Sequence, residues 1–426
     1  MYSFETDPDY QAKLDWAADF VAREVEPLDH VFPNPFDRGD DAAMAVVRPL
    51  MARVREQGLW PCHLGPELGG PGYGQVKLAL LNEILGRSEW APVVFGCQAP
   101  DSGNAEILAH FGTPEQRARY LQPLLDGELV SCFSMTEPQG GSDPRLFTAS
   151  ARRDGDDWVL SGEKWFATNA LEATFYVVML ITDPDVSVHR GASMFLVPAD
   201  TPGLEVIRNV QLAGAHPGRS SHGYLRFNDA RVGPDALLGG EGQAFAIAQT
   251  RLGGGRIHHA MRTIGAAQRA FDLMCERAVS RRTHDGTLAD LGITKQKIAQ
   301  SWIEIEQFRL FVLRTAWLID KYNDYKVVRK DIAAVKAAMP DVLRNVAQRA
   351  LHLHGSLGVS EEMPFGRMLI EAEWLAIVDG PTEVHEITVA KQLLARYEPA
   401  DERFPSGHLP KLREAALAKL GAAAHA

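Results

Sequence analysis

The stretch CFSMTEPQGGSDP, residues 132–144, decides the fold, because the helical periodicity of the chain ends before it and strand patterns follow it. It combines the hydroxyl groups of Ser134, Thr136 and Ser142 with two glycines that let a ligand approach the backbone closely. This composition fits a loop rich in turn formers. It also fits a site where Thr136 and backbone amides meet the polar edge of a flat heteroaromatic ligand.

Upstream of this stretch the sequence predicts helices. Asp7 is expected to cap a helix that begins at Pro8, because apolar residues recur at helical spacing as far as residue 28. The tetrapeptide TPEQ, residues 113–116, matches a capping box at the start of another helix. Residues 1–130 are therefore predicted to form a helical domain.

Downstream, short β-rich runs are bounded by Pro, Gly and Asp, and a hairpin is expected around Asp154-Gly155. Residues 131–240 are therefore predicted to form a compact central β domain. Long helical patterns then return, at about 243–281, 293–322, 326–354, 362–378 and 384–397. The fold class is mainly α with a central β domain, because strands do not alternate with helices as a parallel Rossmann sheet requires. A helical bundle is expected over 241–398, and 399–426 is an unpatterned tail.

Composition limits the possible functions. The 426 residues carry a net charge of −11, which argues against nucleic acid as a main partner. The sequence has no apolar run long enough to span a membrane and no secretory signal, so a soluble cytoplasmic protein is expected. The four scattered cysteines predict reduced thiols. His258-His259 and His352/His354 lack acidic or histidine partners at ligand spacing, so no metal site is expected.

Two further segments carry polar groups among apolar residues. In GEKWFATNA, residues 162–170, Trp165 and Phe166 are either core residues or a stacking surface for a ring. In EWLAIVDGPTEVHEITVAKQ, residues 373–392, a helical pattern is broken at Asp379-Gly380-Pro381. Asp379 either caps the next helix or presents a carboxylate to an apolar pocket.

The motifs together resemble those of one family. MTEPQGGSD (135–143), GEKWFATN (162–169), GGGRIHHAMRTIGAAQRA (253–270) and HGSLG (354–358) occur in the order and at the distances seen in acyl-CoA dehydrogenases, over residues 10–398. Asp379 and QAPDSGN (98–104) make the chain most similar to the subgroup with Asp as catalytic base, which includes the dehydrogenase part of family members 10 and 11. The resemblance implies a helical domain, a β-barrel and a four-helix bundle.

The resemblance also implies an FAD cofactor that extends between barrel and bundle towards a neighbouring subunit. Thr136 would meet the pyrimidine edge of the flavin, Phe166 and Thr168 would lie beside its ring, and Arg281 would bind the pyrophosphate of the partner subunit's FAD. A homodimer or homotetramer follows, with electron-transferring flavoprotein as the electron acceptor. The positions matched to cofactor contacts are Phe133, Met135, Thr136, Gly141, Ser142, Phe166, Ala167, Thr168, Arg281, Gln296, His352, Gly355, Ser356, Pro381 and Thr382.

By the same resemblance Asp379 would be the base that removes the α-proton of an acyl-CoA thioester, while Gly380 helps to polarise its carbonyl. A β-hydride would pass to flavin N5, giving a trans-2-enoyl-CoA. Some relatives place their base immediately before the arginine equivalent to Arg256, where this chain has Gly255. Arg256 is expected in a GGGR turn at the start of a bundle helix. The positions matched to substrate contacts are Ser142, Gly253, Arg256 and Gly380.

Two other functions stay open. A flavin oxidase of the same fold, either an acyl-CoA oxidase or a nitroalkane oxidase-like enzyme, would use oxygen as its electron acceptor. A helical interaction protein that keeps the fold without its chemistry would bind no flavin.

Overall fold

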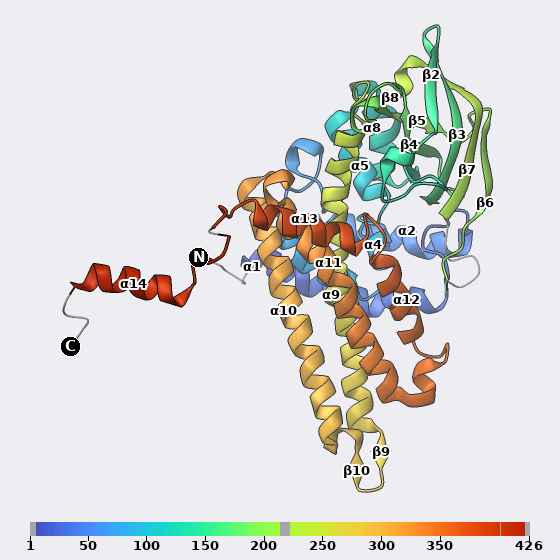
Figure 1. The fold of residues 1–426 in the computed structure, drawn as a ribbon. Coiled ribbons are helices and arrows are strands. Elements are labelled where there is room, and N and C mark those ends of the chain that lie inside the picture. Colours follow the sequence, from blue (N-terminus) through green and yellow to red (C-terminus); the bar gives the residue numbers. More distant parts are fainter. Residues whose placement is uncertain (1–5, 214–221, 401, 422–426) are drawn as a thin grey trace.

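The computed structural model describes residues 6–213, 222–400 and 402–421. Helices precede and follow one β-sheet, so the predicted order of helices, strands and helices is confirmed (Figure 1). The helices of the first group are α1 Pro8–Phe20, α2 Asp41–Glu56, α3 Gly74–Leu85, α4 Ala91–Val94, α5 Asp101–Phe111, α6 Pro114–Gln116 and α7 Gln122–Asp126. Both predicted start signals are confirmed: Asp7 caps α1, and Thr113 with Gln116 forms the capping box of α6.

Four strands of the β-sheet pair with one another in a closed ring. Strand β1 pairs with both β3 and β4, and β2 also pairs with both, so the four strands surround a common core. The predicted hairpin joins β2 to β3, with Asp154 opposite Asp157. The strands are β1 Ser131–Ser134, β2 Ser150–Asp154, β3 Asp157–Thr168, β4 Phe175–Ile181, β5 Ala192–Pro198, β6 Leu204–Asn209, β7 His222–Val232 and β8 Leu237–Leu238, with the short helix α8 Val188–Gly191 before β5.

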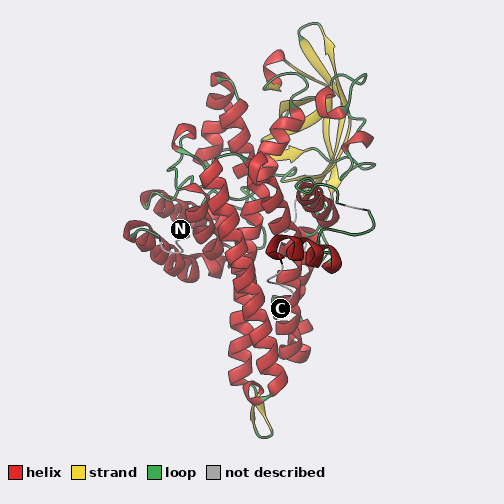
Figure 2. Cartoon of the chain, turned by 60° about the vertical axis from the view of Figure 1, so that its left-hand side comes forward, coloured by secondary structure: helices red, strands yellow, loops and turns green. Residues whose placement is uncertain are grey.

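The long helices of the third group run side by side away from the sheet (Figures 1 and 2). A small hairpin of β9 Arg282–Thr283 and β10 Gly286–Thr287 marks the far end of this bundle. The helices are α9 Ala244–Ser280, α10 Gly292–Tyr322, α11 Tyr325–His354, α12 Phe365–Leu375 and α13 Thr382–Leu394. One apolar core joins α9–α12 to α1–α4, while the first turns of α9 pack with α5 and the sheet. Helix α9 therefore connects all three groups.

One prediction about local structure was wrong. Residues 251–256 do not form a turn, because they lie inside α9. Packing of α9 against α3, α5 and α11 outweighs the low helix propensity of its three glycines. The tail also contains a helix, α14 Leu409–Leu420, which lies apart from the body of the molecule (Figure 1). Its Leu, Ala, Lys, Arg and Glu residues have high intrinsic helix propensity. Residues 401 and 422–426 of the expected tail lie outside the described residues.

The break between α12 and α13 is confirmed. Asp379 and Gly380 both have positive φ, at 55° and 105°, so the chain turns sharply there. Asp tolerates this left-handed conformation better than most side chains do. Pro381 occupies the N-cap of α13, so Asp379 does not cap that helix.

Candidate functional site

A cavity of about 2080 Å³ lies where α5, α9 and α11 meet strands β1 and β3 and the break after α12. A single small ligand occupies a few hundred Å³, so this space has room for a cofactor and a substrate together. The structure brings many of the residues singled out in the sequence to its wall: Phe133, Met135, Thr136, Gly141, Ser142, Phe166, Thr168, Gly253, Arg256, Asp379, Gly380 and Pro381.

Side chains from three bundle helices, α9, α11 and α13, hold the backbone that carries Asp379. The carbonyl oxygen of Asp379 accepts a hydrogen bond from Arg256 Nε at 3.0 Å, and His385 Nε2 lies 3.2 Å from the same oxygen. The buried Lys336 donates Nζ to Leu375 O at 2.5 Å and to Gly380 O at 3.5 Å. These contacts stabilise the unusual backbone, because they satisfy carbonyl groups that the helix break leaves without helical partners.

The carboxylate of Asp379 lies against α9 and is only 16% exposed. A Cβ atom at Gly255 would be 3.2 Å from Asp379 Oδ2, so a side chain there would crowd the carboxylate. One helical turn further on, His259 Nε2 lies 3.9 Å from the same oxygen. The carboxylate therefore occupies space that the missing side chain of Gly255 leaves open.

Two further glycines make room for a second polar group. A Cβ atom at Gly253 would be 3.0 Å from the ring of Tyr325, and one at Gly254 would be 2.9 Å from Glu106 Oε2. Burial raises the pKa of Glu106 to about 8, although a hydrogen bond from Tyr325 opposes the rise. Glu106 is therefore mostly protonated at pH 7.

Burial lowers the pKa of the basic side chains beside Asp379, which include Arg251, His259 and Lys336. Arg251 stacks 4.0 Å from the ring centre of Phe133, and its Nε donates to Asn104 Oδ1 at 3.0 Å. Burial lowers the pKa of His259 to about 4, so this imidazole is neutral at pH 7. Burial also lowers the pKa of Lys336 to about 8, and the attraction of Asp379 limits that fall. Lys336 is thus still mostly cationic at neutral pH.

Another wall is built from two motif segments, the loop after β1 and the second half of β3. Phe166 has a φ of 53° and is 41% exposed, with its edge near the rings of Trp165 and His222. Asn169, also at positive φ, is buried, and its amide has no hydrogen-bond partner among the described residues. An aromatic surface beside hydroxyl groups and a free buried amide can take a planar ligand with polar edges.

A buried ion pair fixes these two segments to each other. Lys164 Nζ lies 2.8 Å from Glu137 Oε1, both side chains are 0% exposed, and Lys164 also donates to Met135 O at 3.0 Å. Glu137 Oε2 in turn accepts the backbone N–H of Thr148 at 2.7 Å and that of Ala149 at 3.2 Å. The pair joins the motif of residues 135–143 to that of 162–169, so it sets the shape of the cavity wall.

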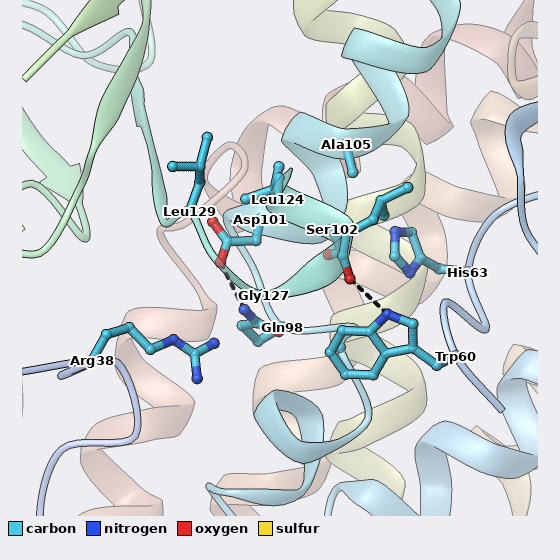
Figure 3. A pocket seen from close by; sticks show the side chains of 12 residues that line it. Arg38, Trp60, His63, Gln98, Asp101, Ser102, Ala105, Leu124, Gly127 and Leu129 are labelled. Atoms are coloured by element: carbon cyan, nitrogen blue, oxygen red, sulfur yellow. Dashed lines mark hydrogen bonds between the residues drawn. The ribbon is translucent and has the colours of Figure 1, made fainter. Parts of the chain in front are cut away.

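A much smaller pocket lies beside the first turn of α5 (Figure 3). Its volume is about 20 Å³, which is enough for about one water molecule. Gln98 donates to Asp101 Oδ2 at 2.7 Å, and Asp101 Oδ1 accepts the backbone N–H and the hydroxyl of Ser131. These bonds fasten α5 to β1, so the pocket belongs to the framework of the large cavity.

Several predicted residues do not reach the cavity. Ala167 and Thr382 follow lining residues in the sequence but do not line it themselves, and Thr382 instead donates its N–H to Ala376 O. The remaining five are exposed and belong to the end of the bundle near β9 and β10 (Figure 1): Arg281, Gln296, His352, Gly355 and Ser356. A role for them at a cofactor needs a second subunit.

Sequence reasoning missed other residues of the cavity. Glu106, Arg251 and Tyr325 lie in ordinary helical patterns with no local signal of a site. His259, whose sequence context raises only the question of a metal site, lines the cavity too. Within residues 6–213, 222–400 and 402–421, no cluster of three or more His, Cys, Asp or Glu side chains suits a metal ion. Across the same residues no helix has the length and apolar character needed to span a membrane.

Comparison with known proteins gives matches along the whole described body of the chain. The N-terminal, middle and C-terminal domains of acyl-CoA dehydrogenases match residues 7–128, 132–230 and 242–394, in that order. The chain is 40% identical to the probable acyl-CoA dehydrogenase FadE2 of Mycobacterium tuberculosis, over 92% of this chain and 93% of that protein.

The chain is also 40% identical to mouse acyl-CoA dehydrogenase family member 10, over 88% of this chain. The match spans only 36% of the mouse protein, so the activity of the whole mouse protein does not transfer directly. A solved structure from Mycobacterium abscessus, provisionally named an acyl-CoA dehydrogenase, is 36% identical and has a TM-score of 0.85 over 92% of this chain and all of that one. A glutaryl-CoA dehydrogenase from Mycobacterium smegmatis, solved with FADH2, shares the fold at 23% identity, with a TM-score of 0.78 over 92% of this chain and 96% of that one.

Proposed function

The chain belongs to the acyl-CoA dehydrogenase family, and on that premise we propose that it catalyses the FAD-dependent α,β-dehydrogenation of an acyl-CoA thioester to a trans-2-enoyl-CoA. The observation that carries this proposal is the Asp379 carboxylate. It lies in the wall of a cavity large enough for two ligands, and its backbone is held in a left-handed turn by Arg256 and Lys336.

The residues of the sheet side fit a flavin. Phe166 offers an aromatic surface, while Thr136, Ser142 and Thr168 offer hydroxyl groups around it. The buried amide of Asn169 can both donate and accept, and it has no partner among the described residues. These groups would hold the ring system and its polar edge. FAD, when bound, accepts the hydride that leaves the β-carbon of the substrate.

Asp379 would remove the α-proton, and the break supplies the matching hydrogen-bond donor. The backbone N–H of Gly380 has no partner among the described residues and can donate to the thioester carbonyl. Such a donor stabilises the negative charge that develops on that oxygen as the proton leaves. The carboxylate of Asp379 and the N–H of Gly380 would thus act on two neighbouring groups of one substrate, the α-carbon and the thioester carbonyl.

The assembly and the electron acceptor follow from the same proposal. Arg281, Gln296, His352, Gly355 and Ser356 lie too far from this cavity to line it, so we infer that they contact the FAD of a partner subunit. A guanidinium such as that of Arg281 suits a pyrophosphate group. The protein would then be a homodimer or homotetramer, and electron-transferring flavoprotein would reoxidise its flavin.

Anaerobic bleaching of the flavin by a panel of acyl-CoA thioesters tests the reaction. Asp379→Asn is expected to retain FAD and to lose flavin reduction by at least about 10²-fold, the low end for an acid–base group. An undiminished rate in this variant would refute Asp379 as the base. Reoxidation by air as fast as by electron-transferring flavoprotein would instead assign the protein as an oxidase of the same fold.

A further inference from the structure

His259 faces the Asp379 carboxylate from α9 and has no other role in the proposed reaction. Its Nε2 lies 3.9 Å from Asp379 Oδ2, and both side chains line the cavity, at 17% and 16% exposure. Gly255 and His259 are four residues apart, so they present neighbouring positions on one helix face. The edge of Trp374 packs near the imidazole, with ring centres 6.1 Å apart, and this contact restrains the ring.

The carboxylate of Asp379 needs such a neighbour. Its backbone is fixed by Arg256, but no hydrogen bond to either carboxylate oxygen is found among the described residues. A separation of 3.9 Å is too long for a hydrogen bond, yet a small side-chain rotation closes it. Hydrogen bonds at catalytic groups are often long without substrate and shorten when substrate binds.

The charge state of the imidazole suits donation. Burial keeps His259 neutral at pH 7, so one ring nitrogen carries a hydrogen and can donate it to an anion. A neutral donor orients the carboxylate through one hydrogen bond and adds no further cation beside it. The charged and titratable groups that face Asp379 from the surrounding elements are Arg251, Arg256, His259 and Arg262 of α9, Lys336 of α11 and His385 of α13.

We propose that His259 is a positioning residue that donates Nε2–H to the Asp379 carboxylate and aims it at the α-hydrogen of the substrate. This inference rests on the proposed function, because it assigns Asp379 as the base. An aspartate is shorter than a glutamate, so its oxygen atoms reach fewer positions from a fixed backbone. A second contact on the carboxylate therefore decides whether the proton is within reach.

The test uses a thioester that can lose only its α-proton. In 3,3-dimethylbutanoyl-CoA the β-carbon carries no hydrogen, so the holoenzyme can exchange the α-hydrogens with D2O but cannot complete oxidation. Proton NMR follows this exchange between pH 5 and 9 in wild type, His259→Phe, His259→Gln and Asp379→Asn. His30→Phe, at an exposed histidine outside the cavity, is the matched control. The FAD content of each variant is measured in parallel.

We expect His259→Phe to retain FAD and to lower the exchange rate roughly 10-fold, the effect of one hydrogen bond to a charged group. The pH profile of the exchange should also change, because a donor to the carboxylate has been removed. His259→Gln, which keeps an N–H donor, should restore part of both. An unchanged exchange rate and pH profile in His259→Phe would overturn the inference. Equal losses of exchange in His259→Phe and His259→Gln, accompanied by loss of FAD, would overturn it too. Normal exchange in Asp379→Asn would instead overturn the proposed function.

Discussion

Lys164→Met breaks the buried ion pair that joins β3 to the loop after β1, and the burial of that pair sets the expected loss of stability. Both Lys164 and Glu137 are 0% exposed, and their charged atoms are 2.8 Å apart. Removing one member of such a pair leaves an unpaired charge in the interior, which costs about 3–5 kcal/mol. The backbone N–H groups of Thr148 and Ala149 still donate to Glu137, so we expect a loss near the lower bound.

Glu137→Gln combined with Lys164→Met should recover most of that loss. The glutamine retains an acceptor for Thr148 and Ala149 but carries no charge, so the double variant buries no unpaired ion. Arg231→Met is the matched control, because Arg231 forms an exposed ion pair with Asp157 in the same sheet, at 51% and 40% exposure. Exposed pairs contribute at most about 1 kcal/mol.

Urea unfolding of the four proteins, followed by fluorescence and by FAD retention, measures the difference. The single variant should unfold at a lower urea concentration than both the control and the double variant, and it should hold FAD less tightly. If the double variant were no more stable than Lys164→Met, the burial of an unpaired carboxylate could not be the cause. The reasoning would then fail, whatever the size of the single effect.

Two further variants test the cavity. Gly255→Ala should raise the free energy of unfolding by up to about 1 kcal/mol, because alanine favours helix more than glycine does. The flavin reduction rate should nevertheless fall about 3- to 10-fold, because the methyl group of the new alanine displaces Asp379 Oδ2 by a few tenths of an ångström. Gly366→Ala in α12, where a methyl group meets nothing within 4 Å, should leave the rate unchanged, and equal rates in both variants would contradict the crowding. Glu106→Gln should flatten the pH dependence of stability. Burial raises the pKa of Glu106 from 4.5 to about 8, so the folded protein keeps a proton that the unfolded chain loses. The stability that this proton contributes is fully present below about pH 4.5 and disappears as the pH rises through 8. Urea midpoints at pH 5–8 measure it beside Glu128→Gln, an exposed control, and an unchanged slope would show that Glu106 ionises normally.

The elements that the sequence predicted well have strong local signals. Helices α9, α10 and α11 are long and periodic, and the start of α1 is marked by Asp7 and Pro8. The hairpin of β2 and β3 follows from Asp154-Gly155 between two β-rich runs. In each case the physical cause lies within a few residues of the chain, so one sequence is enough to see it.

The predictions that failed depend on packing between distant segments. The glycines of 253–255 look like a turn, but α3, α5 and α11 pack around them and hold a helix. Glu106 and Tyr325 meet across about 220 positions of sequence, and neither has a neighbour that marks it as part of a site. The resemblance to a family indicated Asp379, whereas its contact with His259 could be found only by placing α9 against the break after α12.

The three consecutive glycines of α9 explain why the carboxylate lies at position 379. Each glycine weakens a helix by about 1 kcal/mol relative to alanine, so three in a row carry a cost that packing must offset. Side chains at 253, 254 and 255 would collide with or crowd Tyr325, Glu106 and Asp379 respectively. A carboxylate-bearing side chain at 255 would begin within 3.2 Å of the Asp379 oxygen, so the two positions compete for one space. An added side chain at 255 would push the carboxylate aside by a few tenths of an ångström, so the absence of one leaves Asp379 its present position against α9.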